Sequence, residues 1–322
     1  MSAASLTTKK LNIGYGKKEI LADINFELFP GEVIGVLGKN GTGKSTLLKT
    51  LCGLLPSLGG SVELLGNPIS SFSRREMAQK VSVVLTGGLP ASSLSVEEVF
   101  RLGRYPYTNY WGELKEDDLA IIHEAMEIVG LLPFRNANFF ELSDGQKQKT
   151  LIGRALAQDT PVLILDEPTS FLDIPSKMEI VKLLKIIAKE KGKAVLFSCH
   201  DWELVLSMLP LSLLISNNEL YLSSPEDLVM NGKMASSFLS EQFRFDIADA
   251  RFKEKNYHDK KIFLEIEDPD TLKWAGHFLS KLNYQVVDNH LSAEAKVSFR
   301  SGIWCLNGNV NYENLGMLLR AL

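Results

Sequence analysis

The chain has 322 residues, of which 45% are hydrophobic and 23% are charged, and its formal net charge is −4. This composition is typical of a globular protein with one large core or two unequal domains, and the acidic balance argues against a nucleic-acid partner bound through a basic face. The three cysteines lie far apart and the five histidines lack the spacing of metal ligands. The sequence therefore predicts a reducing, cytosolic compartment and no structural metal.

The chain shows no pattern of a membrane segment. The start, MSAASLTTKKLN, lacks an apolar signal core. The most apolar window, residues 204–215, is shorter than the about 20 residues that a membrane-spanning helix needs. We therefore expect any membrane role to be that of a peripheral subunit.

The first third of the chain alternates strand patterns with glycine-rich turns. Residues 6–11 and 24–28 read as strands, and Tyr15 lies in the hairpin between them. Residues 32–37 form a short apolar strand pattern, and a helix pattern begins at Thr46. Strands at 61–65 and 81–85 flank a helix that Ser73 caps.

Between the strand at 32–37 and the helix lies GKNGTGKST, a Gly-x-x-x-x-Gly-Lys-Ser phosphate loop. Its glycines let the backbone N–H groups turn inward around phosphate oxygens, and the helix dipole points at the same place. Lys44 can reach the β- and γ-phosphates, and the hydroxyl of Ser45 can bind Mg²⁺. The predicted phosphate site comprises Gly38, Lys39, Asn40, Gly41, Thr42, Gly43, Lys44, Ser45 and Thr46.

Residues 87–158 read as a helical insertion, with helices after the Ser95–Glu98 capping box, at 116–129 and at 143–157. An α/β pattern then returns, with strands at 162–165, 194–197, 211–215 and 219–222 and helices at 176–191, 202–208 and after Ser224.

The last roughly eighty residues carry no chemical motif but are enough for a domain that folds alone. Strands are predicted at about 262–266, 284–288, 295–299 and 303–306, and helices at 268–282 and 312–322.

Two acids follow the apolar strand at 162–165. After a phosphate loop, an apolar strand that ends in acids is the expected Mg²⁺-side partner, so Asp166 can hold the Mg²⁺ shell. Glu167 then lies where a carboxylate can activate water.

With the phosphate loop and the two acids, three further stretches occur in a family-specific order, and Tyr15 is a separate feature. Residues 142–148, LSDGQKQ, resemble the Leu-Ser-Gly-Gly-Gln signature of ATP-binding-cassette (ABC) ATPases, and SFLD at 170–173 resembles the D-loop of that family. His200, at the end of a strand, resembles the switch histidine that contacts the γ-phosphate. Tyr15 is similar in position to the aromatic residue that stacks on adenine.

The resemblance covers about three quarters of the chain and implies an ATPase that uses ATP and Mg²⁺. It implies a head-to-tail homodimer, in which Lys44, Ser45, Asp166, Glu167 and His200 of one copy face Ser143, Gly145 and Gln146 of the other. Glu167, His200 and Lys44 would then act in hydrolysis. Residues 101–107, RLGRYPY, look like a stretch in the ATPases of importers for iron–siderophore, haem and cobalamin.

This narrower resemblance implies a subunit at the cytoplasmic face of the membrane that energises a separate permease and, indirectly, serves a substrate-binding protein. The aromatic surface at 86–111 is the candidate for docking the permease. Two alternatives stay open: a soluble ABC ATPase without a transport role, and the ATPase of an exporter. A single cassette and the lack of heptad repeats weigh against the soluble class.

Two positions depart from the family pattern. Thr86 stands where the family has a glutamine that binds Mg²⁺, so we expect its hydroxyl to be the corresponding ligand. Asp144 adds a negative charge to the signature, which opposes a nearby γ-phosphate unless the side chain points away or is screened.

The predicted fold is an α/β phosphate-loop NTPase core of the RecA-like type with an antiparallel β subdomain. The ATPase domain is expected at residues 1–241, with the helical subdomain at about 87–158. A smaller α/β accessory domain is expected at residues 242–322.

Overall fold

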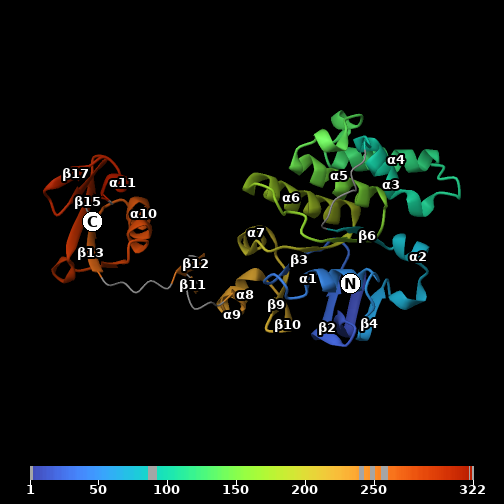
Figure 1. Cartoon of the computed structure of the whole chain (residues 1–322), viewed down its shortest axis with the longest axis horizontal. Coiled ribbons are helices and arrows are strands. Elements are labelled where there is room, and N and C mark those ends of the chain that lie inside the picture. Colours follow the sequence, from blue (N-terminus) through green and yellow to red (C-terminus); the bar gives the residue numbers. More distant parts are fainter. Residues whose placement is uncertain are drawn as a thin grey trace. The chain divides into compact units, whose positions relative to one another are not determined.

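The computed structural model describes residues 3–85, 93–238, 243–246, 251–254, 260–318 and 320. The chain divides into two compact units, Met1–Phe238 and Leu239–Leu322 (Figure 1). The boundary predicted from the sequence, after residue 241, lies three residues further along. Each unit has its own hydrophobic core.

The first unit is built on a six-stranded sheet. The strand order is β10 (Glu219–Ser223), β9 (Ser212–Ser216), β3 (Val33–Leu37), β8 (Ala194–Ser198), β7 (Val162–Leu165) and β6 (Val81–Val84). All neighbours are parallel except β10, which pairs antiparallel with β9. Strands β3, β7, β8 and β9 are buried along their whole length, as expected for a sheet covered on both faces.

Helices cover the two faces of this sheet. Ile34 and Val36 share one core with Leu47 and Leu48 of α1 (Lys44–Leu51). Gly35 points the other way, where a side chain would contact Val205 of α7 (Trp202–Met208). Helix α6 (Ile174–Lys191) packs against β3 and β8, and α8 (Pro225–Met230) and α9 (Lys233–Phe238) end the unit.

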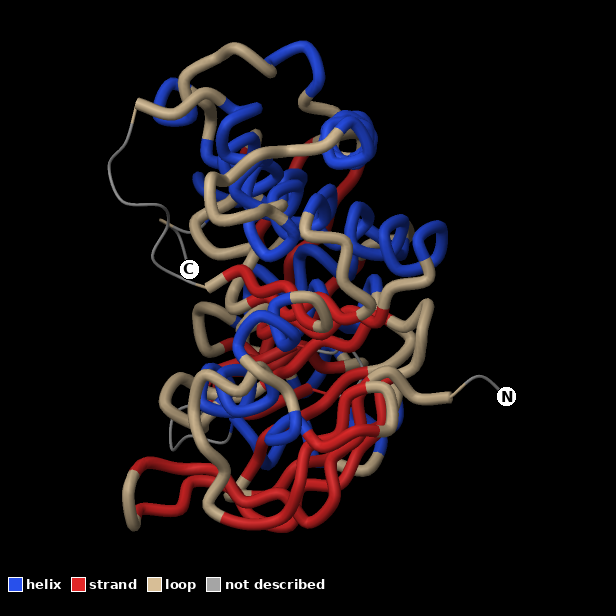
Figure 2. The backbone as a smooth tube through the Cα atoms, turned by 90° about the vertical axis from the view of Figure 1, so that its right-hand side faces the viewer, coloured by secondary structure: helices blue, strands red, loops and turns tan. Residues whose placement is uncertain are grey.

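A second, antiparallel sheet covers α1. Its order is β2 (Lys18–Leu28), β1 (Leu6–Tyr15), β4 (Gly59–Leu64) and β5 (Asn67–Pro68). Leu6 pairs with Leu28 on one side and with Leu64 on the other, and all three are buried against the α1 core. The tube in Figure 2 shows these strands in red at the end of the unit opposite most of the helices.

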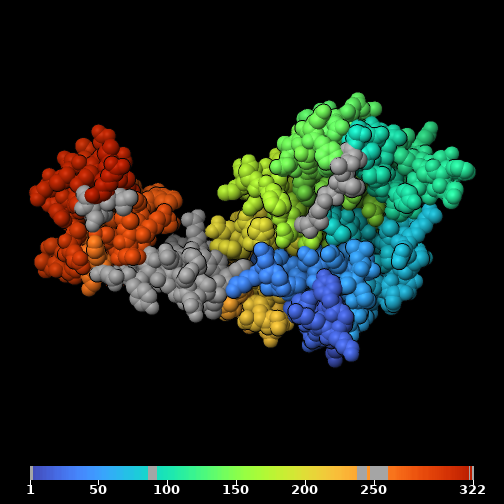
Figure 3. Space-filling view, viewed as in Figure 1, coloured from blue at the N-terminus to red at the C-terminus, as the bar shows by residue number. Residues whose placement is uncertain are grey.

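The helical insertion contains α3 (Val96–Gly103), α4 (Glu116–Ile128) and α5 (Asp144–Ala157). The predicted capping box is confirmed, because the Glu98 N–H donates to Ser95 and the Ser95 N–H donates to Glu98. Helices α3 and α5 approach closely at Gly153, where any side chain would collide with the Phe100 ring. In Figure 3 the insertion, cyan to green, and the antiparallel sheet, blue, occupy opposite ends of the first unit.

A buried ion pair ties the insertion together. The Arg104 guanidinium contacts Asp118 at 2.8 Å, and both side chains are almost fully buried. Arg104 also donates to the carbonyl oxygen of Ala157 at 3.0 Å. The short helix α2 (Arg74–Ala78) joins the core to this insertion, since Arg75 donates to the carbonyl oxygens of Pro106 and Thr108.

The second unit is a five-stranded sheet with two helices. Its order is β14 (Tyr284–Val287), β13 (Lys260–Glu265), β15 (Ala295–Arg300), β16 (Ile303–Leu306) and β17 (Val310–Tyr312). Helices α10 (Pro269–Ser280) and α11 (Leu315–Leu318) contribute Ala275, Leu279 and Leu318 to its core. Near the start of the second unit, β11 (Phe243–Asp246) pairs with β12 (Arg251–Glu254) in a separate two-stranded sheet.

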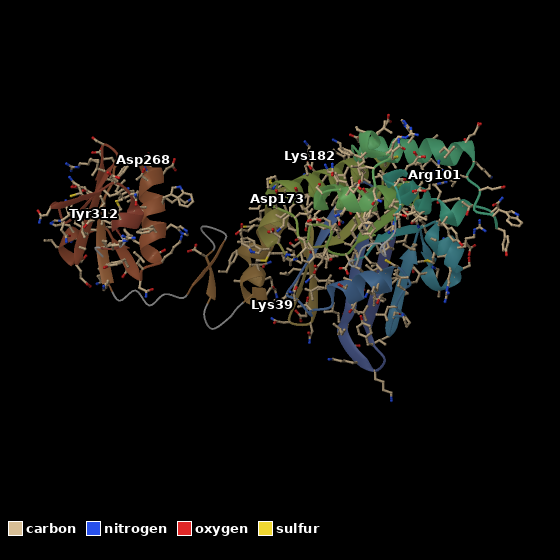
Figure 4. The ribbon with its side chains drawn as sticks, turned by 45° about the horizontal axis from the view of Figure 1, so that its top comes forward. Lys39, Arg101, Asp173, Lys182, Asp268 and Tyr312 are labelled. Carbon is tan, nitrogen blue, oxygen red and sulfur yellow. The ribbon has the colours of Figure 1, made fainter. Side chains whose placement is uncertain are left out.

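The predicted fold class is confirmed: an α/β phosphate-loop core with an antiparallel sheet, a helical insertion and a small α/β unit. The predicted helix over 312–322 is wrong at its start. Tyr312, labelled in Figure 4, ends strand β17, because the turn at Asn307–Asn309 folds Val310 back onto Leu306. Within the described residues, no helix is long and apolar enough to cross a membrane.

Candidate functional site

The candidate site lies at one edge of the six-stranded sheet. Strand β8 lies between β3 and β7, and the three strands are parallel. The chain segments that follow Leu37, Leu165 and Ser198 therefore leave the sheet at the same edge. This arrangement brings together the phosphate loop, the two acids and His200, which are far apart in the sequence.

The phosphate loop wraps the start of α1. Gly43 has a φ of 106°, and a side chain there would lie 2.7 Å from Ile20, so the position requires glycine. The Lys44 ammonium donates to the carbonyl oxygens of Gly38 at 2.8 Å and Lys39 at 3.0 Å. Burial lowers the pKa of Lys44, whereas the Glu167 and Asp166 carboxylates oppose that shift. Its two hydrogen bonds hold the Lys44 side chain across the phosphate loop.

Asp166 connects the two halves of the site. Its Oδ1 accepts a hydrogen bond from the Ser45 hydroxyl at 3.0 Å and another from the Ser198 hydroxyl at 2.7 Å. The Ser198 hydroxyl in turn accepts the backbone N–H of Glu167 at 2.7 Å. Ser198 is fully buried at the end of β8 and holds both acids in place. Sequence reasoning missed it, although a serine in the apolar run AVLFS is a visible signal.

Glu167 has a φ of 51° and lies next to Asp166. Its Oε2 accepts a hydrogen bond from the Ser170 hydroxyl at 2.9 Å. The segment then turns into α6, whose first turn is capped by Asp173. Figure 4 labels Asp173 at this helix start and Lys39 on the phosphate loop. Phe171, which lies between Glu167 and Asp173 in the sequence, is 97% exposed.

Two predicted residues flank the site. Tyr15 is half exposed, and its hydroxyl accepts from Thr46 at 3.4 Å, so the ring stands beside the first turn of α1. His200 is exposed two residues after the end of β8. The next residue, Asp201, is held by Lys177 at 3.0 Å and caps α7.

The signature residues lie elsewhere in the same chain. Ser143 and Gln146 form a capping box at the start of α5, and Gly145 faces Ser176 of α6. Within the described residues, no hydrogen bond of Ser143, Gly145 or Gln146 reaches the phosphate loop. The Asp144 side chain is 74% exposed, 3.9 Å from the Lys147 ammonium, which screens its charge. Thr86 lies outside the described residues.

The oxygen donors at this site suit Mg²⁺. The ion usually takes one or two protein oxygens and completes its shell with water and phosphate. The Ser45 hydroxyl and the Asp166 carboxylate, 3.0 Å apart, form such a set. Across the described part of the chain, no group of three or more His, Cys, Asp or Glu could hold a metal by itself. The site therefore fits a cation that arrives with a phosphate ligand.

Comparison with known proteins gives consistent matches. The family described as "ABC transporter" matches residues 21–170. An uncharacterized ABC transporter ATP-binding protein of Methanocaldococcus jannaschii is 37% identical over 296 residues, covering 89% of this chain and all of the relative. The iron(3+)-hydroxamate import ATP-binding protein of Bacillus subtilis is 38% identical over 197 residues, covering 61% of this chain and 73% of the relative.

Two further matches agree with these. The ferric enterobactin transport ATP-binding protein of Escherichia coli is 32% identical over 200 residues, covering 62% of this chain and 74% of that protein. Among solved structures, an inward-facing putative metal-chelate type ABC transporter aligns with a TM-score of 0.65 at 26% identity, covering 73% of this chain and 89% of that one.

Proposed function

This chain belongs to the family of ABC transporter ATP-binding proteins, and we propose that it energises import of an iron–siderophore, haem or cobalamin type substrate through a separate membrane permease. As a member of that family it binds and hydrolyses ATP. The observation that carries the residue assignment is the cluster of Ser45, Asp166 and Glu167 around the buried Lys44. The names of the relatives support the class of substrate.

In this proposal the phosphate loop positions ATP and neutralises its charge. Lys44 turns from the loop carbonyls to the phosphate oxygens, and Tyr15 packs against the adenine. Ser45 and Asp166 hold Mg²⁺, with Thr86 as a further candidate. When bound, the ion neutralises developing charge on the phosphates. Glu167 accepts the proton of the attacking water, and His200 contacts the γ-phosphate.

A second copy completes the site in this proposal. Ser143, Gly145 and Gln146 make no hydrogen bond to the phosphate loop of their own chain among the described residues, so they are available to another. An exposed apolar strip lies at and just before the start of α6: Phe171, Ile174 and Met178, with exposed fractions of 97%, 72% and 45%. Such a strip favours a covered surface. ATP bound between two copies would close the dimer, and hydrolysis would open it.

The permease would dock beside α2. A groove of about 570 Å³ is lined by Leu54, Ile69, Phe72 and Met77, among others. Arg75 of α2 binds the carbonyl oxygens of residues 106 and 108, so a partner that presses on this groove also acts on the helical insertion. The predicted docking surface at 86–111 includes Pro106 and Thr108, whose carbonyl oxygens Arg75 binds. Among its described aromatic residues, Tyr105, Tyr110 and Trp111 are exposed, whereas Phe100 is buried.

Glu167→Gln tests the site assignment. The amide keeps the shape of the carboxylate but cannot accept the proton, so we expect ATP binding to persist, hydrolysis to fall about 100-fold or more, and the dimer to be trapped. ATPase rate, nucleotide binding and size-exclusion chromatography are measured together. Glu27→Gln, an exposed glutamate on β2, is the control and should behave as the wild type. Undiminished hydrolysis by Glu167→Gln contradicts the assignment.

Co-purification tests the transport role. Expressed with a candidate permease from the same genome, the chain should purify from membranes together with that permease. A chain that stays in the soluble fraction supports the alternative of a non-transport ABC ATPase, and export of the substrate from loaded cells supports an exporter.

A further inference from the structure

The sheet of the second unit has one face that its own helices do not cover. Ile262, Leu264 and Val297 point to the side of α10 and α11, where the core lies. Because side chains alternate along strands, the intervening residues point to the other side. On β13 and β15 most of these are polar or charged, as in Glu265, Lys296 and Arg300, and Phe263 shares the same face. The described residues of this face form a hollow of about 580 Å³.

Two cations flank one carboxylate in this hollow. The Lys296 ammonium lies 3.0 Å from Oε1 of Glu265, and Nη2 of Arg300 lies 3.0 Å from Oε2. The hydrogen bond from Lys296, followed by the charge of both cations, lowers the pKa of Glu265, so the carboxyl stays ionised. The three groups together carry one net positive charge. Arg300 is 76% exposed and contacts Glu265 through one nitrogen only, which leaves the rest of its planar fork for an oxyanion.

Neutral polar groups complete the lining. The strand register aligns Glu265, Ser298, Cys305 and Asn311 in one row across β13, β15, β16 and β17. Among the described residues, the side chains of Ser298, Cys305 and Asn311 have no hydrogen-bond partner. These groups are therefore able to bind hydroxyl or carbonyl groups of a ligand.

The comparisons indicate that this face is not part of the common ATPase machinery. The import proteins of Bacillus subtilis and Escherichia coli match only 61% and 62% of the chain. The first unit ends at Phe238, so a match to 89% of the chain must extend into the second unit, as it does for the Methanocaldococcus jannaschii relative. The second unit is thus an addition that the alignment with at least one relative reaches.

We propose that the open face of this sheet is a binding site for a small organic anion. Arg300 and Lys296 bind its carboxylate or phosphate group, and the Ser298–Asn311 row binds its neutral polar groups. When the ligand is absent, Glu265 pairs with both cations, and it competes with the ligand for them. This site is separate from the nucleotide site and does not depend on the proposed transport role.

Cys305 makes the proposal testable in the full-length protein. It lies in the hollow and is partly exposed, whereas Cys52 and Cys199 are buried, and burial raises the pKa of both thiols. A maleimide should therefore modify Cys305 first, which mass spectrometry verifies. Citrate serves as the carboxylate probe and inorganic phosphate as the phosphate probe. The modification rate of Cys305 reports on binding close to that residue, so binding of either probe at the phosphate loop does not change the measurement.

We expect at least one probe to protect Cys305, with about tenfold slower modification at about ten times its dissociation constant. Arg300→Gln should weaken protection about tenfold or more, since it removes a charge-assisted contact. Glu265→Gln should strengthen it, because the competing carboxylate is lost. Lys260→Gln is the matched control: Lys260 lies two residues before Ile262 on β13, so its side chain points to the face opposite the hollow.

The rates without probe are measured for each variant, so that changes in thiol reactivity are not counted as binding. Protection by citrate alone or phosphate alone supports the proposal and identifies the oxyanion. The proposal is overturned if neither probe protects Cys305, or if Arg300→Gln and Glu265→Gln protect as the wild type does.

Discussion

Ser198→Ala removes one buried hydroxyl that holds both acids of the candidate site. That hydroxyl donates to Asp166 at 2.7 Å and accepts the N–H of Glu167 at 2.7 Å. It lies at the end of β8, with no exposed surface. Alanine therefore leaves the Glu167 N–H without its partner and deprives Asp166 of one of its two serine contacts, while Ser45 keeps the other.

The expected magnitude follows from these two bonds. A hydrogen bond to a charged group contributes about 1.5–3 kcal/mol, and a buried N–H without a partner costs about 1–3 kcal/mol. We expect the free energy of unfolding of the first unit to fall by roughly 2–5 kcal/mol, since the two effects overlap. Residues that hold a metal ligand in place change metal affinity or activity about 10–100-fold, so we expect ATPase activity at limiting Mg²⁺ to fall by that factor.

The assay combines ATPase rates over a Mg²⁺ titration with urea unfolding. Ser216→Ala is the control, because the Ser216 hydroxyl is also buried at the end of a strand of the same sheet, β9, but has no hydrogen-bond partner among the described residues. We expect this control to be neutral or slightly stabilising. The reasoning is refuted if Ser198→Ala keeps the wild-type Mg²⁺ dependence, or if Ser216→Ala loses as much activity.

Three further predictions concern other parts of the chain. Asp118→Ala leaves the buried Arg104 charge without its partner. We expect it to lower the free energy of unfolding, measured with urea, by about 3–5 kcal/mol. Burial raises the pKa of Asp118, but hydrogen bonds from the Lys115 N–H and Arg104 outweigh burial and lower that pKa. The stabilisation from the ionised carboxylate is therefore complete above about pH 4 and is lost as the pH falls through the lower pKa of the folded state. The alanine variant should lack this pH dependence. Deleting residues 239–322 should leave a folded ATPase, because the cores are separate; an insoluble product would contradict this. Trp111→Ala should reduce co-purification with the permease while ATPase activity is unchanged; equal losses of both would argue against a docking role.

Local patterns explain why much of the fold could be predicted. Strand β7, the capping box at Ser95 and the helix cap at Ser73 depend on residues within a few positions of one another, and the structure has them where the sequence placed them. The chain end shows the limit. An apolar run after residue 312 reads as a helix, but pairing with β16 recruits Tyr312 into a strand, and the helix begins at Leu315.

The sequence by itself determined the chemistry of this protein, because a phosphate loop, a signature and a strand that ends in two acids, in this order, are local features with specific residue types. Tertiary structure decided which side chains support that chemistry. Ser198 reaches Asp166 across 32 residues, and Arg75 reaches Thr108 across 33, only because strand order and helix packing bring them together. The same holds for Glu265, Lys296 and Arg300, which share a face only once β13 and β15 are in register.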